Sequence, residues 1–333
     1  MYLKYFKIKE EPFSTTPNPK FLFKSRTHQE ALDRIVTSVS QRRGINAIIG
    51  EPGLGKSMLI RTMLSGLKEN VRFAWVFNTT LNARELLKYI CRDFGFRPKG
   101  RDTSDLLMDL YAFLMKEFEQ GIFTLLIIDE AQNLKVEVLE EIRQLSNLET
   151  TSNKLLQVVL SGQPQLDTHL EHPALQQLKQ RINLKATLSR LNLHETKEYI
   201  HRRLQVAGSK RDDLFSDAAL DAVYEISDGI PRLINQVCDN CLMEAAKRKC
   251  NQVESVLVRE LLERGDIMAA SKPAKPKKET RPVQEFDRLI RKSPPLAYVP
   301  TPNNGHSNIG SKILDTVLSS GFDGLDLGTL AIN

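Results

Sequence analysis

The chain changes its hydrophobic pattern near residue 192. Before that point, short apolar runs alternate with stretches in which apolar residues recur every three or four positions. Short apolar runs predict strands buried on both faces, and the wider spacing predicts helices. The expected strands are residues 45–49, 72–77, 122–128, 156–160 and 182–187, and a helix is expected at about 27–41. This alternation predicts an α/β fold, with a parallel sheet flanked by helices and a ligand at the carboxyl ends of the strands.

The strand pattern stops at about residue 193, and only helical spacing continues. The expected helices are residues 195–207, 216–227, 231–248 and 253–265, separated by turn signals such as Gly208-Ser209 and Asp228-Gly229. We therefore expect four segments: an extended N-terminal lead-in (residues 1–27), a sheet-containing core (28–192), a small all-helical lid (193–268) and a tail (269–333).

The tail is rich in proline and basic residues and has too few apolar residues for a packed core. Most of the chain's net charge of +6 comes from lysines and arginines between residues 271 and 292. We expect this tail to be disordered. It is either a solvated linker or a contact for nucleic acid or an acidic surface, and its apolar segments 313–318 and 325–330 are candidates for docking on a partner.

The 333 residues contain no run of about 18 apolar residues, so we expect no transmembrane helix and no direct membrane insertion. The first residues lack the apolar stretch of a signal peptide, which makes the cytoplasm the expected location. Cys238 and Cys241 have a spacing that zinc sites use, but no second ligand pair accompanies them. We expect both to be reduced cysteines in a helical core.

Residues 50–57 read G-x-x-x-x-G-K-S between an apolar run and a helical pattern, the strand–loop–helix setting of a phosphate-binding P-loop. Backbone N–H groups and the N-terminus of the following helix are expected to contact phosphate oxygens. Lys56 is expected to reach the β- and γ-phosphates, and the Ser57 hydroxyl to bind Mg²⁺. A chance glycine turn is the alternative. The predicted nucleotide-binding residues are Gly50, Glu51, Pro52, Gly53, Leu54, Gly55, Lys56, Ser57 and Met58.

A second motif follows the longest apolar run, which ends in the two carboxylates of Asp129 and Glu130. A buried strand with this ending would place Asp129 beside the P-loop, where it would help to bind Mg²⁺ because hard cations prefer oxygen ligands. Glu130 is the expected catalytic base that polarises the attacking water. The alternative is a charged turn that starts a helix, since aspartate is a common helix N-cap.

Further residues are candidates for contact with the nucleotide or with the attacking water. Gln163, or Ser161 in its place, follows the next strand and is expected to contact the water or the γ-phosphate, although a plain turn explains it equally well. Arg181 precedes the last strand, where an arginine of one subunit would reach the nucleotide of its neighbour. Arg143 is the second candidate for that finger, and a surface arginine is the alternative for Arg181.

Arg232 is the candidate for contact between the lid and the nucleotide. It follows Pro231, a residue favoured in the first turn of a helix, and an ordinary helix start is the alternative. There it would contact the γ-phosphate, so that hydrolysis would release the lid. A P-loop sheet followed by a helical lid is the arrangement of AAA+ ATPases.

The chain resembles the ExeA group (general secretion pathway protein A) of AAA+ ATPases, which are similar to the ATPases of Mu- and Tn7-type transposition. The resemblance covers roughly residues 1–265. It implies ATP, Mg²⁺, assembly into a ring or filament with ATP at subunit interfaces, and a lead-in near the adenine. Besides the P-loop, the matching segments are residues 5–6, 12–13, 17–22, 28–32, 129–134, 145–150, 156–164, 180–182 and 229–235.

The resemblance leaves the client open. Secretion members continue into a membrane span and a cell-wall-binding region, and this sequence shows neither. We therefore expect a transposition-type ATPase that binds double-stranded DNA and a transposase-like protein, with contacts from loops 79–84 and 97–101. The alternatives are an ATPase of a secretion or polysaccharide-export system that acts through protein partners, and an ATP-gated scaffold with negligible turnover.

Overall fold

The computed structural model describes residues 2–67, 70–77 and 79–270. These residues fall within one unit of connected contacts. The expectations for the tail beyond residue 270, including its apolar segments 313–318 and 325–330, lie outside the described residues.

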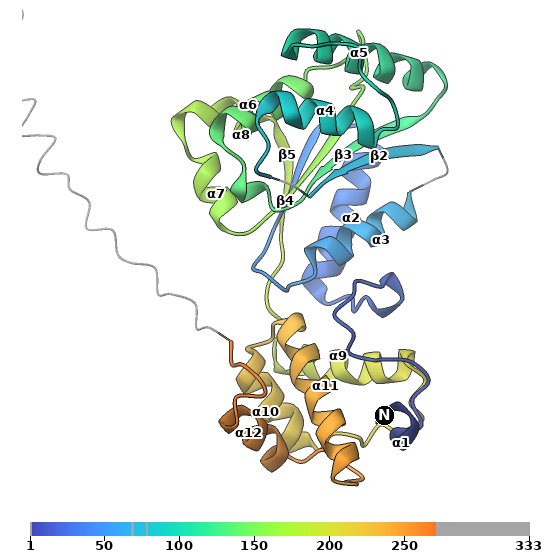
Figure 1. The fold of residues 1–333 in the computed structure, drawn as a ribbon, viewed down its shortest axis with the longest axis vertical. Helices are drawn as coiled ribbons and strands as arrows, with labels where there is room; N and C mark the ends of the chain where they lie inside the picture. Colours follow the sequence, from blue (N-terminus) through green and yellow to red (C-terminus); the bar gives the residue numbers. More distant parts are fainter. Residues whose placement is uncertain (1, 68–69, 78, 271–333) are drawn as a thin grey trace, which may run out of the picture. The chain divides into compact units, whose positions relative to one another are not determined.

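The strands form a sheet that lies between helices (Figure 1). It has five parallel strands in the order β2-β3-β4-β1-β5. This confirms the predicted α/β fold. Every residue of β1 and β4 is buried, which explains why these strands read as continuous apolar runs. The strands are β1 (Ile45–Ile49), β2 (Val71–Val76), β3 (Phe123–Ile128), β4 (Gln157–Gly162) and β5 (Ile182–Thr187).

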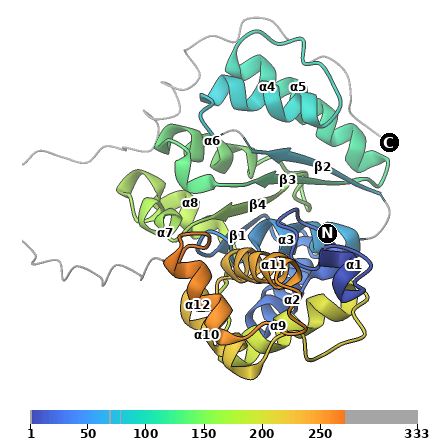
Figure 2. The same ribbon diagram turned by 60° about the horizontal axis from the view of Figure 1, so that its bottom comes forward.

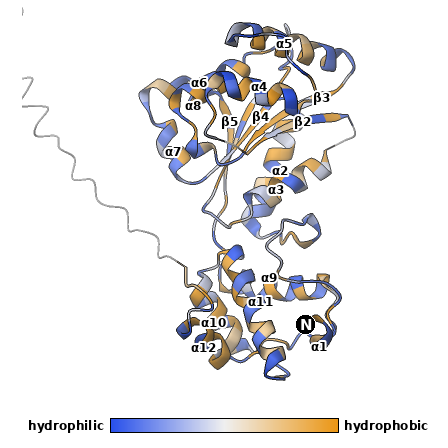
Figure 3. Ribbon diagram, in the orientation of Figure 1, coloured by the Kyte–Doolittle hydropathy of each residue, from blue (hydrophilic) through white to orange (hydrophobic). Residues whose placement is uncertain are grey.

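Helices cover both faces of this sheet, α2 and α3 on one and α4, α5 and α6 on the other (Figures 1 and 2). Successive strand residues point to opposite faces, so Ile127 packs with α2 and α3 while Ile128 packs with α4 to α6. The strands are accordingly hydrophobic and the helices amphipathic (Figure 3). The elements are α2 (Arg26–Ser40), α3 (Lys56–Gly66), α4 (Ala83–Asp93), α5 (Thr103–Glu119), η2 (Ala131–Asn133), α6 (Val136–Leu145), α7 (Gln165–Leu170), η3 (Pro173–Leu175) and α8 (Gln176–Arg181).

Four helices follow β5 and share a second hydrophobic core, close to the positions that the sequence predicts. Cys238 and Cys241 lie buried in this core as free thiols, because they occupy the apolar face of the third helix. None of the helices among the described residues combines the length and apolar character that a membrane crossing requires. The four helices are α9 (Leu193–Val206), α10 (Asp217–Ser227), α11 (Pro231–Lys247) and α12 (Ser255–Glu263).

The N-terminal lead-in differs from the extended segment that we expect. It contains the helix α1 (Tyr2–Phe6) and the 3-10 turn η1 (Pro19–Phe21). Tyr2, Phe6, Phe13 and Phe21 are buried in the same core as α9 to α12, and the Tyr2 hydroxyl donates to Asp239 Oδ1 at 2.6 Å. Burial of these aromatic side chains favours the packed conformation over an extended one.

A glycine joins the sheet region to the helical region. Leu191, in the link between β5 and α9, donates its N–H to the Gly229 carbonyl at 2.9 Å. Gly229 has a φ of +70°, and a Cβ there would lie 1.9 Å from the Leu191 carbonyl oxygen. The backbone approach therefore requires glycine on both conformational and steric grounds.

We predict that Gly229→Ala lowers the free energy of unfolding by about 2–5 kcal/mol, because left-handed strain adds to a backbone clash. Gly265→Ala is the matched control, since Gly265 also has a positive φ but no atom within 4 Å of the place that a Cβ would occupy. That control should lose only about 1–2 kcal/mol. Chemical denaturation measures both, and equal losses would contradict the steric account.

Candidate active site

The P-loop connects β1 to α3 and encloses its own lysine. Gly53 and Gly55 have φ values of +85° and +92°, which let the backbone curl around the start of α3. Lys56 is only 5% exposed, and its Nζ donates to the Gly50 and Glu51 carbonyls at 2.8 and 3.1 Å. Burial lowers the pKa of Lys56, and nearby carboxylates oppose this shift. The ammonium group therefore lies inside the curve of the loop, where phosphate oxygens would bind.

The two predicted metal-binding residues, Ser57 and Asp129, are in direct contact. Asp129 is 6% exposed at the end of β3, and its Oδ2 accepts the Ser57 hydroxyl at 2.8 Å. Its Oδ1 accepts the Ser161 hydroxyl at 2.7 Å, so Ser161 supports this carboxylate. A carboxylate and a hydroxyl are oxygen donors of the kind that Mg²⁺ prefers, so the residues present fit this ion.

Glu130 has a left-handed backbone, with φ +52°, and its carboxylate accepts two amide donors. Gln132 Nε2 donates to Oε2 at 2.6 Å, and Gln163 Nε2 donates to the same oxygen at 3.0 Å. Burial raises the pKa of Glu130, but these hydrogen bonds and the charge of Lys56 outweigh it and hold the pKa below its ordinary value. Gln163 thus contacts the predicted base, and its role toward water or phosphate stays a prediction.

A cavity of about 410 Å³ extends from the P-loop to the helical region. Glu130 and Arg232 line it near the P-loop, and Arg232 N–H donates to the Gly53 carbonyl at 3.3 Å. Phe21, Tyr199 and Asn235 line it as well. The predicted phosphate-binding and lid residues are therefore close together, as the sequence suggests.

The lead-in forms one wall of this cavity, held by a buried arginine that the sequence did not single out. Arg203 is 5% exposed and donates to the Tyr199 hydroxyl at 2.8 Å and to the Ser14 carbonyl at 3.3 Å. A third bond reaches the Pro12 carbonyl. Its guanidinium also lies 4.9 Å from the centre of the Phe21 ring, a cation–π distance.

His28 connects α2 to the P-loop and is a further residue that sequence reasoning missed. Its Nε2 lies 2.7 Å from the Leu54 carbonyl, and its Nδ1 lies 2.7 Å from the Ser25 hydroxyl. Burial lowers the pKa of this imidazole, so the neutral form donates to Leu54 and accepts from Ser25. The side chain thereby holds the loop, and it also lines the cavity.

Arg181 and Arg143 lie apart from this cavity. Arg181 ends α8 just before Ile182, which pairs with Ile45 at the start of β1, whereas the P-loop follows the other end of that strand. Its Nη1 donates weakly to the Ser146 hydroxyl at 3.4 Å. Arg143 pairs with Glu140 at 2.5 Å. Neither arginine is among the described residues that line the P-loop cavity, and contact with a neighbouring copy stays a prediction.

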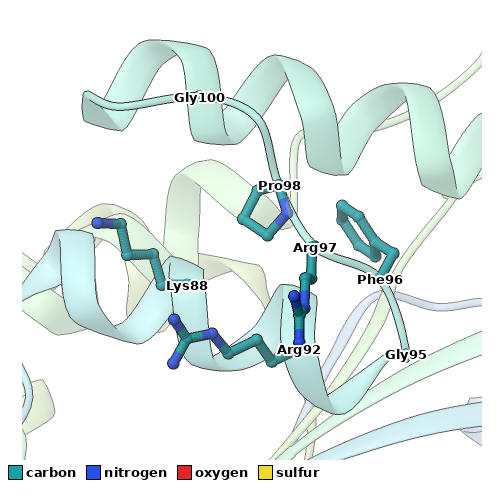
Figure 4. Close-up of a pocket in the computed structure, with 7 residues that line it drawn as sticks. All are labelled: Lys88, Arg92, Gly95, Phe96, Arg97, Pro98 and Gly100. Atoms are coloured by element: carbon teal, nitrogen blue, oxygen red, sulfur yellow. The ribbon is translucent and has the colours of Figure 1, made fainter.

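The two loops that we expect to contact DNA flank α4. Lys88 and Arg92 project from α4, and Arg97 from the following loop, into a second cavity of about 680 Å³ (Figure 4). The loop is held by Asp109, whose Oδ2 accepts the N–H groups of Lys99 and Gly100 at 2.6 and 2.8 Å. Within residues 2–67, 70–77 and 79–270, the three cations form no ion pair.

Residues 39–170 match a family described as "AAA domain". The chain is also 40% identical to General secretion pathway protein A of Aeromonas hydrophila over 255 residues, 76% of this chain. It spans only 46% of that relative's length. This similarity agrees with the ExeA part of the resemblance, whereas none of these comparisons points to the Mu- and Tn7-type ATPases.

Several solved structures share the fold. The Aeropyrum pernix ORC2 protein, solved as ADPNP–ADP complexes, has a TM-score of 0.61 and 18% identity, covering 79% of this chain and 73% of its own. Cdc6p from Pyrobaculum aerophilum has a TM-score of 0.58 and 19% identity, covering 73% and 67%. Drosophila ORC bound to DNA has a TM-score of 0.57 and 18% identity, covering 81% and 67%. At such identities the likeness shows the fold alone.

The P-loop, the strand order and these similarities lead to one conclusion. The chain has the AAA+ P-loop fold, and it is similar to general secretion pathway protein A over about three quarters of its length.

Proposed function

We propose that this protein hydrolyses ATP to ADP and phosphate in the P-loop cavity. The observation that carries the proposal is the meeting of Lys56, Glu130 and the Ser57–Asp129 pair at one end of that cavity. The water oxygen forms a bond to the γ-phosphorus while the bond to the β–γ bridging oxygen breaks, and the electron pair stays on ADP. The water proton passes to the Glu130 carboxylate, and Lys56 stabilises the negative charge on the transferred group.

Magnesium fits the same end of the cavity. Ser57 and Asp129 are the residues that would hold it, directly or through water. When bound, Mg²⁺ neutralises charge on the β- and γ-phosphates. Ser161 contributes by holding Asp129 in position through its hydrogen bond to Oδ1.

The remaining cavity suits the nucleoside. Phe21 and Tyr199 offer aromatic surface to the cavity, and Asn235 an amide. The lead-in is therefore the proposed adenine contact. Arg232 lies at the start of α11 and lines the same cavity, where it would contact the phosphates of a bound nucleotide. Phosphate content would then change the contact between lid and P-loop.

We infer that the chain works as an assembly, in a ring or filament with ATP between subunits. Arg181 is too far along the sheet to act on its own P-loop, which is what a finger supplied to a neighbour requires. The long bond from its guanidinium to Ser146 is compatible with that use, since such a bond is easily exchanged for a phosphate contact.

As client, we propose the protein partners of a secretion system. The similarity to general secretion pathway protein A supports this alternative better than the transposition-type function that we expect from the sequence. The protein would then convert hydrolysis into movement of a partner, through the contact between lid and P-loop.

A DNA-directed function is the second candidate, and one observation favours it. Lys88, Arg92 and Arg97 surround one cavity without ion pairs among the described residues, and phosphate oxygens would satisfy them (Figure 4). Duplex DNA and a transposase-like protein are the partners in that case.

We predict that Glu130→Gln lowers kcat for ATP at least about 100-fold while the Kd for ATP stays within about threefold, because only the proton acceptor is lost. Phosphate release and fluorescent-nucleotide binding measure the two quantities. Glu137→Gln, a change on α6 outside the cavity, is the matched control and should leave both unchanged. Rapid turnover by Glu130→Gln would remove Glu130 as the base.

The client is tested by deleting the gene and measuring exported protein in the medium. We predict a loss of export that wild-type protein restores and Glu130→Gln does not, together with turnover that duplex DNA leaves unchanged. Normal export would overturn the secretion proposal. ATP-dependent, salt-sensitive DNA binding that is lost in the triple variant Lys88→Ala, Arg92→Ala, Arg97→Ala would instead support the second candidate.

A further inference from the structure

Gln132 lies in the 3-10 turn η2 directly after the proposed base, and both polar atoms of its side-chain amide form hydrogen bonds. Its Nε2 donates to Glu130 Oε2 at 2.6 Å, and its Oε1 accepts the backbone N–H of Gln163 at 3.0 Å. A backbone N–H can only donate, so the atom facing Gln163 must be the amide oxygen. The N–H group of Gln132 must then point at Glu130. The side chain is 7% exposed, which removes water as a competing partner.

The end of β4 is shaped around this amide. A Cβ at Gly162 would lie 3.1 Å from Gln132 Oε1 and 2.8 Å from Leu166 Cδ2. Glycine therefore leaves room for Gln132 to reach the Gln163 backbone. Gln163 then adds a second donor to Glu130 Oε2, so two amides from different segments converge on one carboxylate oxygen.

The end of β4 also contacts the P-loop. Gly50, the first residue of the P-loop, donates its N–H to the Gly162 carbonyl at 3.1 Å. Gly162 thus contacts the P-loop, and the next residue in the chain, Gln163, contacts Gln132 and Glu130.

The two amide donors also define which carboxylate oxygen of Glu130 can accept a proton from water. Both bind Oε2, and no hydrogen bond to Oε1 occurs among the residues that the structure describes. Oε1 is accordingly the oxygen available to accept a proton from water.

We propose that Gln132 is a positioning residue for hydrolysis: it orients the Glu130 carboxylate, together with Gln163, and leaves Oε1 free for water. The proposal rests on the proposed ATPase function and adds a residue to it. Among the described residues, Gln132 does not belong to those that line the cavity, so we expect it to act through Glu130. Loss of its side chain should therefore slow the chemical step without weakening nucleotide binding.

The test is steady-state ATP turnover and ATP affinity of the full chain, with thermal unfolding as a check on folding. Gln132→Ala is expected to lower kcat about tenfold or more, the effect of one hydrogen bond to a charged group, while KM and Kd stay within about twofold. Asn133→Ala, an exposed change in the same turn, is the matched control and should behave as wild type. Gln132→Leu, which keeps the volume, replaces the alanine variant if that variant fails to fold.

A double variant separates positioning from a general loss of structure. If Gln132 acts through Glu130, then Glu130→Gln with Gln132→Ala should be no slower than Glu130→Gln alone. An unchanged kcat in Gln132→Ala, a raised KM with normal kcat, or a further multiplicative loss in the double variant would each overturn the proposal. Absence of turnover in the wild type would instead overturn the proposed ATPase function, so the two failures are distinguishable.

Discussion

The geometry of the site depends on one arginine that joins the P-loop to the helical region. Arg190 lies between β5 and α9, and its side chain is 17% exposed. Its Nε donates to Glu51 Oε1 at 3.0 Å, its Nη2 contacts Glu51 Oε2, and its Nη1 contacts Asp228 Oδ2. Two parallel bonds between a guanidinium and a carboxylate also fix the orientation of the two side chains relative to each other. Asp228 begins the turn that leads to Arg232, so Arg190 sets the position of the helix start relative to the phosphate-binding loop.

The cavity is therefore a composite of segments distant in sequence. The lead-in, the P-loop and the helices α9 and α11 each supply a wall. Arg203 connects α9 to the lead-in, and Arg190 connects the P-loop to the turn before α11. Glu51 and Asp228 remain partly exposed, which limits how strongly their pairs stabilise the resting arrangement. The proposed coupling of nucleotide content to lid movement would act through these contacts.

Much of this architecture could be predicted from the sequence, because its signals are local. The strands, the later helices, the P-loop and the Asp129–Glu130 pair are visible as apolar runs, spacing and glycines. Gln132, Arg190 and His28 were not singled out, since their importance arises only where the fold brings them to Glu130, Glu51 and Leu54. The helix α1 was missed for a similar reason, as its aromatic residues need the helical region for burial. The similarity to a secretion protein favours a different client from the one expected, because catalytic motifs carry no record of the partner.

We propose that this cavity binds and hydrolyses a nucleoside triphosphate. Phosphate release from ATP tests this proposal when it is measured with and without magnesium, in wild type and Lys56→Ala, at protein concentrations high enough for assembly. The account predicts magnesium-dependent release by the wild type and none by the variant, because Lys56 supplies the charge inside the loop. Equal release by both proteins, or no affinity of the wild type for adenine nucleotides at any magnesium concentration, would contradict it.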